Sequence, residues 1–146
     1  MSSADIYREI ILDYYRNPRN YGKLDDADVV VKDSNPLCGD EVEMHIKFEN
    51  GKIKDIRFNG KGCAISQASA SMLTEIVMKK SIEDVKKIGK EDILENLGLT
   101  NLGPARIKCA LLSLKVLKMG IYSYLADKVG EKLEASKVKE DANKLY

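Results

Sequence analysis

The chain has 146 residues, of which 44% are hydrophobic and 32% are charged, and its formal net charge is +1. This size and balance indicate an ordinary globular domain, because disordered chains are poorer in apolar residues and more biased in charge. The small net charge argues against a nucleic-acid binder, which needs a basic excess to displace counterions from phosphates. We expect one domain over residues 1–146, in which residues from about 130 to 146 form a charged tail that frays.

The N-terminal segment lacks the pattern of a signal peptide, because Asp5, Arg8 and Glu9 interrupt its apolar residues. No unbroken run approaches the roughly 18 apolar residues of a membrane span. We therefore expect a cytoplasmic protein that does not use a membrane. The three cysteines are an odd number, and disulfides are rare in a reducing compartment, so the thiols are either small core residues or part of a chemical site.

The first half of the chain predicts one helix and three strands. Apolar residues at helical spacing predict an amphipathic helix over residues 4–16, which Asn17-Pro18 ends. Strands are predicted at 29–31 and, from strict alternation, at 41–48. Asn50-Gly51 then predicts a type I′ hairpin into a third strand, where Ile53 falls out of the alternation and indicates a bulge or a late start.

The second half predicts helices. One covers 64–80, short helices cover 81–88 and 91–97, and Gly103-Pro104 begins a long helix that continues through Leu125. Strands followed by helices are typical of an α+β fold. We expect a small three-stranded antiparallel sheet packed on one face by helices, with the polar face of the strands in solvent.

Each cysteine lies in a turn or near the start of a predicted helix. Cys38 stands in NPLCGD between the first two strands, with Asp40 two positions on, and Cys63 stands in NGKGCAIS immediately before a helix. Cys109 falls in the second turn of the helix that Pro104 begins. The positive end of a helix attracts a thiolate, so these positions favour the form of cysteine that binds metals.

A single cysteine is most often a small buried residue, but three in such positions favour a site. Three thiolates and a carboxylate would provide four ligands suited to zinc or to iron bound with inorganic sulfide. The long segments between the cysteines fit no zinc finger, so the site would form only in the tertiary structure. A cysteine hydrolase would need a base, and the sole histidine, His45, alternates with Glu43 and Lys47 and is predicted to lie on the surface.

Four stretches of this chain resemble the iron-sulfur cluster assembly scaffold family, the group of IscU, SufU and the NifU N-terminal domain. They read NPRNYG, NPLCGD, GKGCAISQASASM and PARIKCA, and the resemblance extends from Ile6 to about Leu125. It implies a SufE/NifU-like sandwich and a scaffold, not an enzyme. Such a scaffold builds a transient [2Fe-2S] cluster with sulfur from a cysteine desulfurase of the IscS or SufS kind and transfers it to apo-proteins, acting as a monomer or a homodimer.

The same resemblance implies that Cys38, Asp40, Cys63 and Cys109 bind the cluster or metal. Asp40 is the family's aspartate, which is linked to cluster lability, and a hard carboxylate oxygen suits iron-sulfide less well than thiolate does. Cys38 and Cys109 are the candidates for first accepting a persulfide. Whether the usual occupant is a [2Fe-2S] cluster or Zn²⁺ stays open here.

Two features depart from the common family pattern. Lys108 stands where many members have a histidine, and Lys108 and Arg106 are either charge partners of Asp40 or of a bound cluster, or a solvated basic pair. LGPAR replaces the LPPVK-type segment that specialised Hsp70 chaperones bind. The motifs around Cys63 and Cys109 resemble the SufU branch, whose members hold zinc and accept sulfur, whereas the short segment between these cysteines resembles the scaffolds. A zinc-bound, SufU-like sulfurtransferase is therefore the alternative function.

Overall fold

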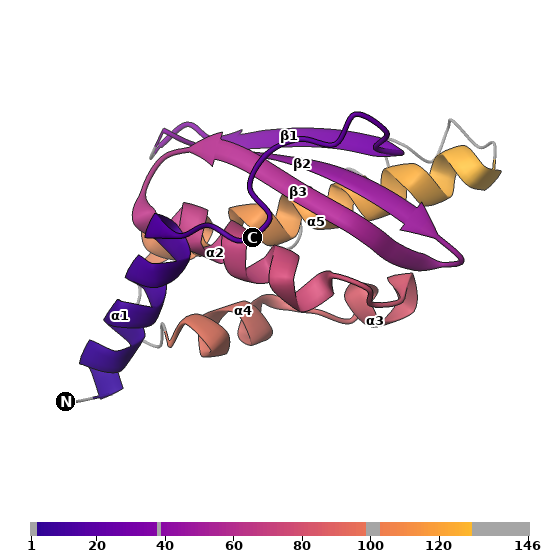
Figure 1. Cartoon of the computed structure of the whole chain (residues 1–146). Coiled ribbons are helices and arrows are strands. Elements are labelled where there is room, and N and C mark those ends of the chain that lie inside the picture. The colour runs from indigo at the N-terminus through magenta and orange to yellow at the C-terminus, as the bar shows by residue number, and fades with distance from the viewer. Residues whose placement is uncertain (1–2, 38, 99–102, 130–146) are drawn as a thin grey trace.

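The computed structural model describes residues 3–37, 39–98 and 103–129, which form a three-stranded sheet and five helices (Figure 1). The predicted tail at 130–146 lies outside the described residues. In chain order the elements are α1 (Ser3–Arg16), β1 (Val29–Asn35), β2 (Asp40–Glu49), β3 (Lys52–Lys61), α2 (Ala64–Val77), α3 (Ile82–Lys86), α4 (Lys90–Leu97) and α5 (Pro104–Val129).

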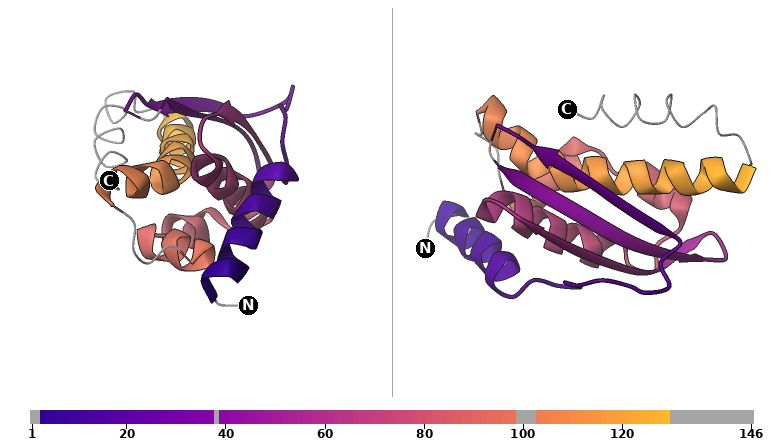
Figure 2. Two further views of the ribbon diagram at one scale, coloured as in Figure 1. Left: turned by 90° about the vertical axis from the view of Figure 1, so that its left-hand side faces the viewer. Right: turned by 90° about the horizontal axis from the view of Figure 1, so that it is seen from above.

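The sheet is antiparallel in the order β1-β2-β3, and the helices cover one of its faces (Figures 1 and 2). Helix α5 packs against β1 and β2, and α2 packs against β3 and α5. Alternate residues of the strands point toward these helices and are buried, among them Val42, Met44, Ile46, Ile56 and Phe58. The predicted α+β architecture is therefore confirmed. Its physical basis is that the apolar face of a small sheet must be buried, here by a layer of helices.

The β2–β3 hairpin follows the sequence prediction closely. Asn50 and Gly51 form its two-residue turn with φ values of 53° and 74°, both positive as a type I′ turn requires. The register then shifts: Lys47 pairs with Asp55 but Phe48 pairs with Ile53. This bulge brings Ile53 into the core, where it is fully buried, and so confirms the bulge that its broken alternation predicted.

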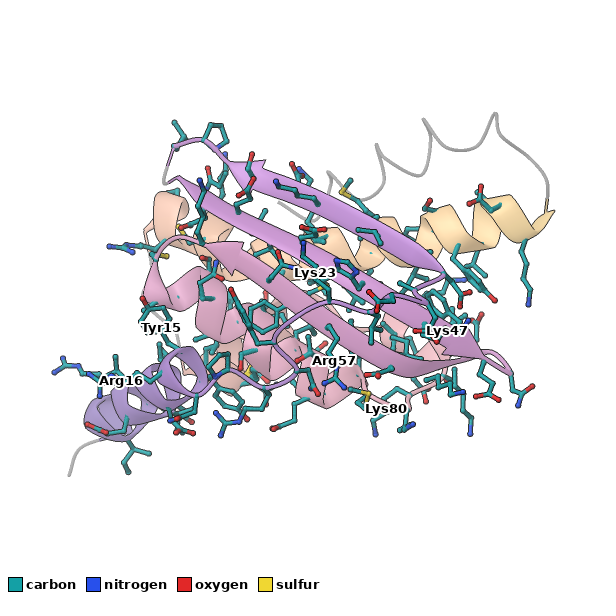
Figure 3. The ribbon with its side chains drawn as sticks, turned by 45° about the horizontal axis from the view of Figure 1, so that its top comes forward. Tyr15, Arg16, Lys23, Lys47, Arg57 and Lys80 are labelled. Carbon is teal, nitrogen blue, oxygen red and sulfur yellow. The ribbon has the colours of Figure 1, made fainter. Side chains whose placement is uncertain are left out.

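The other face of the sheet is crossed by residues 17–28, here called the crossing segment (Figure 3). Its backbone first pairs with the edge strand β3, where Gly22 N–H donates to Phe58 O at 2.8 Å and Phe58 N–H donates to Asn20 O at 3.0 Å. It then passes over the strands, with Lys23 above the sheet, and enters β1. The expectation that this whole face is open to solvent is therefore wrong.

His45 shows the effect of the crossing segment. It lies on the predicted outer face of β2, but only 7% of it is exposed, so the prediction of a surface residue is wrong. Its Nδ1 lies 3.4 Å from both the N and the O of Leu24, and its Nε2 lies 3.1 Å from Glu43 Oε1. The only histidine of the chain thus faces away from the helices, and a cysteine hydrolase that uses it as base is not supported.

Helix α5 is the central core helix. Its residues 106–128 are long and apolar enough to cross a membrane by length and composition alone, but 67% of the apolar window is buried inside the domain. A core helix of a globular domain passes the same test. Gly120 lets α5 approach the sheet closely, since a Cβ there would lie 2.8 Å from Ile46 Cδ1.

Candidate metal centre

Three of the four predicted ligand residues are described, and they meet at one end of the sheet. Asp40 is the first residue of β2, Cys63 precedes α2, and Cys109 lies in the second turn of α5. Their ligand atoms, one carboxylate oxygen and two Sγ atoms, all lie within 4.8 Å of one another. Cys38 lies outside the described residues, although its neighbours Leu37 and Gly39 belong to the loop that leads into Asp40.

Asp40 is completely buried, and its carboxylate is directed at Cys63. Oδ1 accepts the backbone N–H of Cys63 at 2.7 Å, and Oδ2 lies 3.6 Å from the Cys63 Sγ. Within the described ranges, none of the ion pairs includes Asp40. A buried carboxylate is costly unless it is paired or binds a cation, so this arrangement is what a metal ligand would need.

Cys63 is the N-cap residue of α2. Its Sγ accepts the N–H of Ser66 at 3.5 Å, while the Ser66 hydroxyl donates to Cys63 O at 3.1 Å. The cap fixes the direction of the sulfur at the helix start, where unpaired N–H groups face an incoming anion or thiolate. Cys63 is half-buried and Cys109 is fully buried, so the centre opens to the surface on the Cys63 side.

Gly62 and Gly39, which stand beside the candidate ligands Cys63 and Asp40, both have positive φ values. Gly62 has a φ of +133°, and a Cβ there would lie 2.2 Å from Asp40 Oδ1 and 2.7 Å from Asp40 Cα. Only glycine permits this backbone conformation and this close approach. On the other loop Gly39 has a φ of +70°, and Asn35 Oδ1 accepts the N–H of Leu37 at 3.2 Å, an Asx turn that shapes the loop start.

Lys108 and Arg106 are exposed on the first turns of α5. Neither appears among the ion pairs that the described residues form, with Asp40 or with any other carboxylate. Their role as charge partners of the centre stays a prediction.

The sequence did not single out Gln67, which also belongs to this region. The residue is 8% exposed, and its side chain donates to the backbone carbonyls of Glu41 and Lys61 beside the two ligand loops. The sequence carries only a weak signal for Gln67, which is a large polar residue between the small residues at the start of α2.

The ligand set fits the metals that the sequence suggested. Two sulfur ligands with one carboxylate oxygen suit Zn²⁺, and the same atoms can bind iron that carries inorganic sulfide. All three described groups are held by hydrogen bonds or by the core, so little rearrangement is needed to bring them onto one ion. The arrangement can therefore hold a metal, and its one hard oxygen makes it a less retentive site for soft iron-sulfide than four thiolates would be.

The chain belongs to the NifU-like N-terminal domain family, whose model matches residues 6–131. A relative named iron-sulfur cluster assembly scaffold protein IscU, from Aquifex aeolicus, is 43% identical over 134 residues, covering 90% of this chain and 83% of the relative. A relative named zinc-dependent sulfurtransferase SufU, from Bacillus subtilis, is 42% identical over 133 residues, covering 80% and 89%. The relatives thus carry both names that the motifs suggested.

Solved structures agree with the fold. A candidate iron-sulfur cluster assembly scaffold protein for the SUF system from Fervidobacterium islandicum superposes with a TM-score of 0.65 at 33% identity, covering 82% of this chain and 99% of that one. The N-terminal part of a NifU-like protein from Brucella abortus has a TM-score of 0.69 at 24% identity, covering 82% and 94%, and shows the fold alone.

Proposed function

We propose that this protein is a scaffold on which a [2Fe-2S] cluster is assembled and from which it passes to apo-proteins. The observation that carries the proposal is the convergence of Asp40, Cys63 and Cys109, whose ligand atoms lie within 4.8 Å of one another. Relatives named as IscU scaffolds, with 33% to 43% identity, support it. Iron and sulfide are the cargo of such a protein and leave it with each transfer.

Cys38, Cys63 and Cys109 would supply thiolates to the iron atoms, and Asp40 would supply one oxygen. Oδ1 of Asp40 accepts the Cys63 N–H, whereas Oδ2 is turned toward the Cys63 Sγ, so Oδ2 is the better placed oxygen to share a metal with that sulfur. A single carboxylate oxygen binds iron-sulfide less tightly than thiolate does, which suits a protein that must release its cluster. Exposed Lys108 and Arg106 would offset the negative charge of the loaded site.

Sulfur would arrive from a cysteine desulfurase. A thiolate of this protein attacks the terminal sulfur of the desulfurase persulfide, an S–S bond forms on the acceptor, and the desulfurase cysteine leaves as a thiolate. Reduction of each transferred sulfur to sulfide then takes two electrons from an external reductant. Cys109 is fully buried, which argues against Cys109 as the first acceptor and leaves Cys38 of the two candidates. Mass spectrometry of Cys38→Ser and Cys109→Ser variants after sulfur loading tests this order.

Anaerobic reconstitution tests the proposal directly. The protein is mixed with ferrous iron, cysteine, a cysteine desulfurase and excess dithiothreitol, and we expect sulfide-to-iron charge-transfer absorption that moves to an apo-ferredoxin on addition. Cys63→Ser and Cys109→Ser variants should not form the chromophore. A wild-type protein that stays colourless while fully occupied by zinc would overturn the scaffold function.

A zinc-bound sulfur acceptor is the second candidate, favoured by the 42% identity to the zinc-dependent sulfurtransferase of Bacillus subtilis. The same residues would hold Zn²⁺, which would fix the site and mask a thiolate until sulfur transfer. Metal analysis of protein purified without oxygen separates the two functions. Stoichiometric zinc, with persulfide on one cysteine and no cluster, would support the sulfurtransferase.

The remaining expectations follow from this function. We propose that the protein acts in the cytoplasm, with a cysteine desulfurase and apo iron-sulfur proteins as partners. Dependence on a specialised Hsp70 is not proposed, because LGPAR replaces the proline-rich segment that such chaperones bind. Size-exclusion chromatography with and without a bound cluster distinguishes a monomer from a homodimer that shares the cargo.

A further inference from the structure

Gln67 makes a cluster of hydrogen bonds beside the metal centre without being one of its candidate ligands. It lies in the first turn of α2 and is only 8% exposed. Its Nε2 lies 3.1 Å from Lys61 O, 3.3 Å from Glu41 O and 3.1 Å from Ser66 Oγ. One side-chain amide therefore contacts three oxygens at the same time.

Two of these oxygens belong to the chain segments that carry Asp40 and Cys63. Glu41 and Lys61 are paired across β2 and β3 at the end of the ladder. Glu41 directly follows Asp40, and Lys61 precedes Gly62 and Cys63. Gln67 thus ties α2 to both chain segments that carry the described ligands of the first two motifs.

The chemistry of the contact admits only an N–H donor. Backbone carbonyls accept hydrogen bonds and cannot donate, so an amide nitrogen must face Glu41 O and Lys61 O. Ser66 Oγ uses its own proton toward Cys63 O and so also accepts from Gln67. A carboxylate of the same shape at this position would place a negative oxygen against three acceptors and push the two loops apart.

We propose that Gln67 is a positioning residue of the metal centre, which holds the Asp40 and Cys63 loops at the separation that ligation needs. The inference rests on the proposed function, because it assumes that these residues bind a metal. Groups that orient metal ligands through hydrogen bonds contribute strongly to metal affinity without touching the ion. Gln67 would orient the ligands through two backbone carbonyls, that of Glu41 directly after Asp40 and that of Lys61 two residues before Cys63.

The test is an anaerobic Co²⁺ titration of the full chain, followed through thiolate-to-cobalt charge transfer and the ligand-field bands. Gln67→Glu keeps the shape and removes the donor, and Gln67→Met removes it without adding charge. Asn59→Asp is the matched control, because Asn59 Nδ2 donates to Gly22 O at 3.2 Å, in the crossing segment. We expect about tenfold weaker binding and altered ligand-field bands in both Gln67 variants, and wild-type behaviour in Asn59→Asp.

The possible outcomes distinguish failure of the proposed role of Gln67 from failure of the proposed metal centre. Wild-type affinity and spectra in both Gln67 variants would overturn the positioning role and leave the metal centre intact. An equal loss in Asn59→Asp would also overturn it, because a general loss of stability would then explain the effect. A wild-type protein that gives no thiolate-to-cobalt band would overturn the metal centre itself, and the role of Gln67 with it. If Gln67→Glu does not fold, Gln67→Met decides.

Discussion

The carboxylate of Asp40 and the main chain of Cys63 are joined directly, with Oδ1 accepting the Cys63 N–H at 2.7 Å and Oδ2 lying 3.6 Å from the Cys63 Sγ. Asp40 therefore has two tasks. One oxygen fixes the loop before α2, and the other is turned toward the sulfur. This division explains how one residue can be both a structural acceptor and a metal ligand.

Replacing Asp40 by alanine should make a reconstituted cluster longer-lived and slow its transfer to an apo-ferredoxin. The physical reason is the loss of the hard oxygen ligand, after which soft ligands alone hold the iron. The rate of bleaching under argon and the half-time of transfer measure the effect. A variant whose cluster decays faster than that of the wild type would contradict the prediction.

Asp40→Asn is the control for the structural task of the same residue. The amide oxygen can still accept the Cys63 N–H, whereas Asp40→Ala takes the partner away from that part-buried donor, which costs at most the roughly 1–3 kcal/mol of a fully buried one. We therefore expect Asp40→Ala to unfold at lower denaturant concentration than Asp40→Asn. Equal midpoints in urea would show that the hydrogen bond contributes nothing to stability.

Gly62→Ala should damage the centre more than Gly51→Ala does. The new methyl group would lie 2.2 Å from Asp40 Oδ1, on a backbone with a φ of +133°. We expect a loss of about 2–3 kcal/mol in the free energy of unfolding and a weaker Co²⁺ complex. Gly51→Ala is the matched control, since its φ is +74° but nothing lies within 4 Å of the added Cβ. Similar losses of Co²⁺ affinity in both variants would show that contact with Asp40 is unimportant.

Arg19→Ala should loosen α1 without weakening the metal centre. Arg19 Nη2 lies 2.6 Å from Asp13 Oδ2, its Nε lies 3.6 Å from Glu75 Oε2, and its guanidinium lies 4.3 Å from the centroid of the Tyr14 ring. This residue of NPRNYG thereby links α1 to α2. Hydrogen-deuterium exchange should become about threefold faster in α1, with an unchanged Co²⁺ affinity. Arg8→Ala, on the exposed face of the same helix, provides the control.

The Arg19 contact should also depend on pH. Hydrogen bonding by Arg19 lowers the pKa of Asp13 below its ordinary 3.8. A lowered carboxyl pKa contributes stability that is present above the ordinary value and is lost as the pH falls through the folded pKa. Protection of α1 from exchange should therefore fall below about pH 4 in the wild type. This fall should be smaller in Arg19→Ala, where the hydrogen bond from Asn17 still lowers the pKa of Asp13.

Lys118 should make the stability of the domain rise with pH in the alkaline range. It is 4% exposed, its Nζ donates to Lys86 O, and burial lowers its pKa below the ordinary 10.5. Between the folded pKa and 10.5 the unfolded chain binds more protons, so the free energy of unfolding increases with pH there, by at most about 1.4 kcal/mol per pH unit for one proton.

Lys118→Met should remove this slope. Urea unfolding at several pH values up to 10.5 measures it, in the wild type and in the variant. The loss of the hydrogen bond to Lys86 O shifts the curve of the variant by a constant amount, so the comparison depends on the slope alone. Identical slopes would refute the assignment.

The strands, the Asn50-Gly51 hairpin and the bulge beside Ile53 could be predicted because each depends on neighbours in the chain. His45 could not be placed correctly. Its alternation with Glu43 and Lys47 gives the right face of β2, but its burial comes from Leu24 in a crossing segment that shows no periodicity. Local pattern specifies the direction of a side chain, whereas burial depends on what else covers that face.

The candidate site divides in the same way. The sequence by itself indicated the motifs, the family and the candidate ligand residues, because turn glycines, helix starts and thiols can be read along the chain. Only the tertiary structure decided that Asp40, Cys63 and Cys109 lie within 4.8 Å of one another and that Gln67 holds two of their loops together. Such distances depend on how α2 and α5 pack against the end of the sheet, and packing between segments far apart in the chain leaves no local pattern in the sequence.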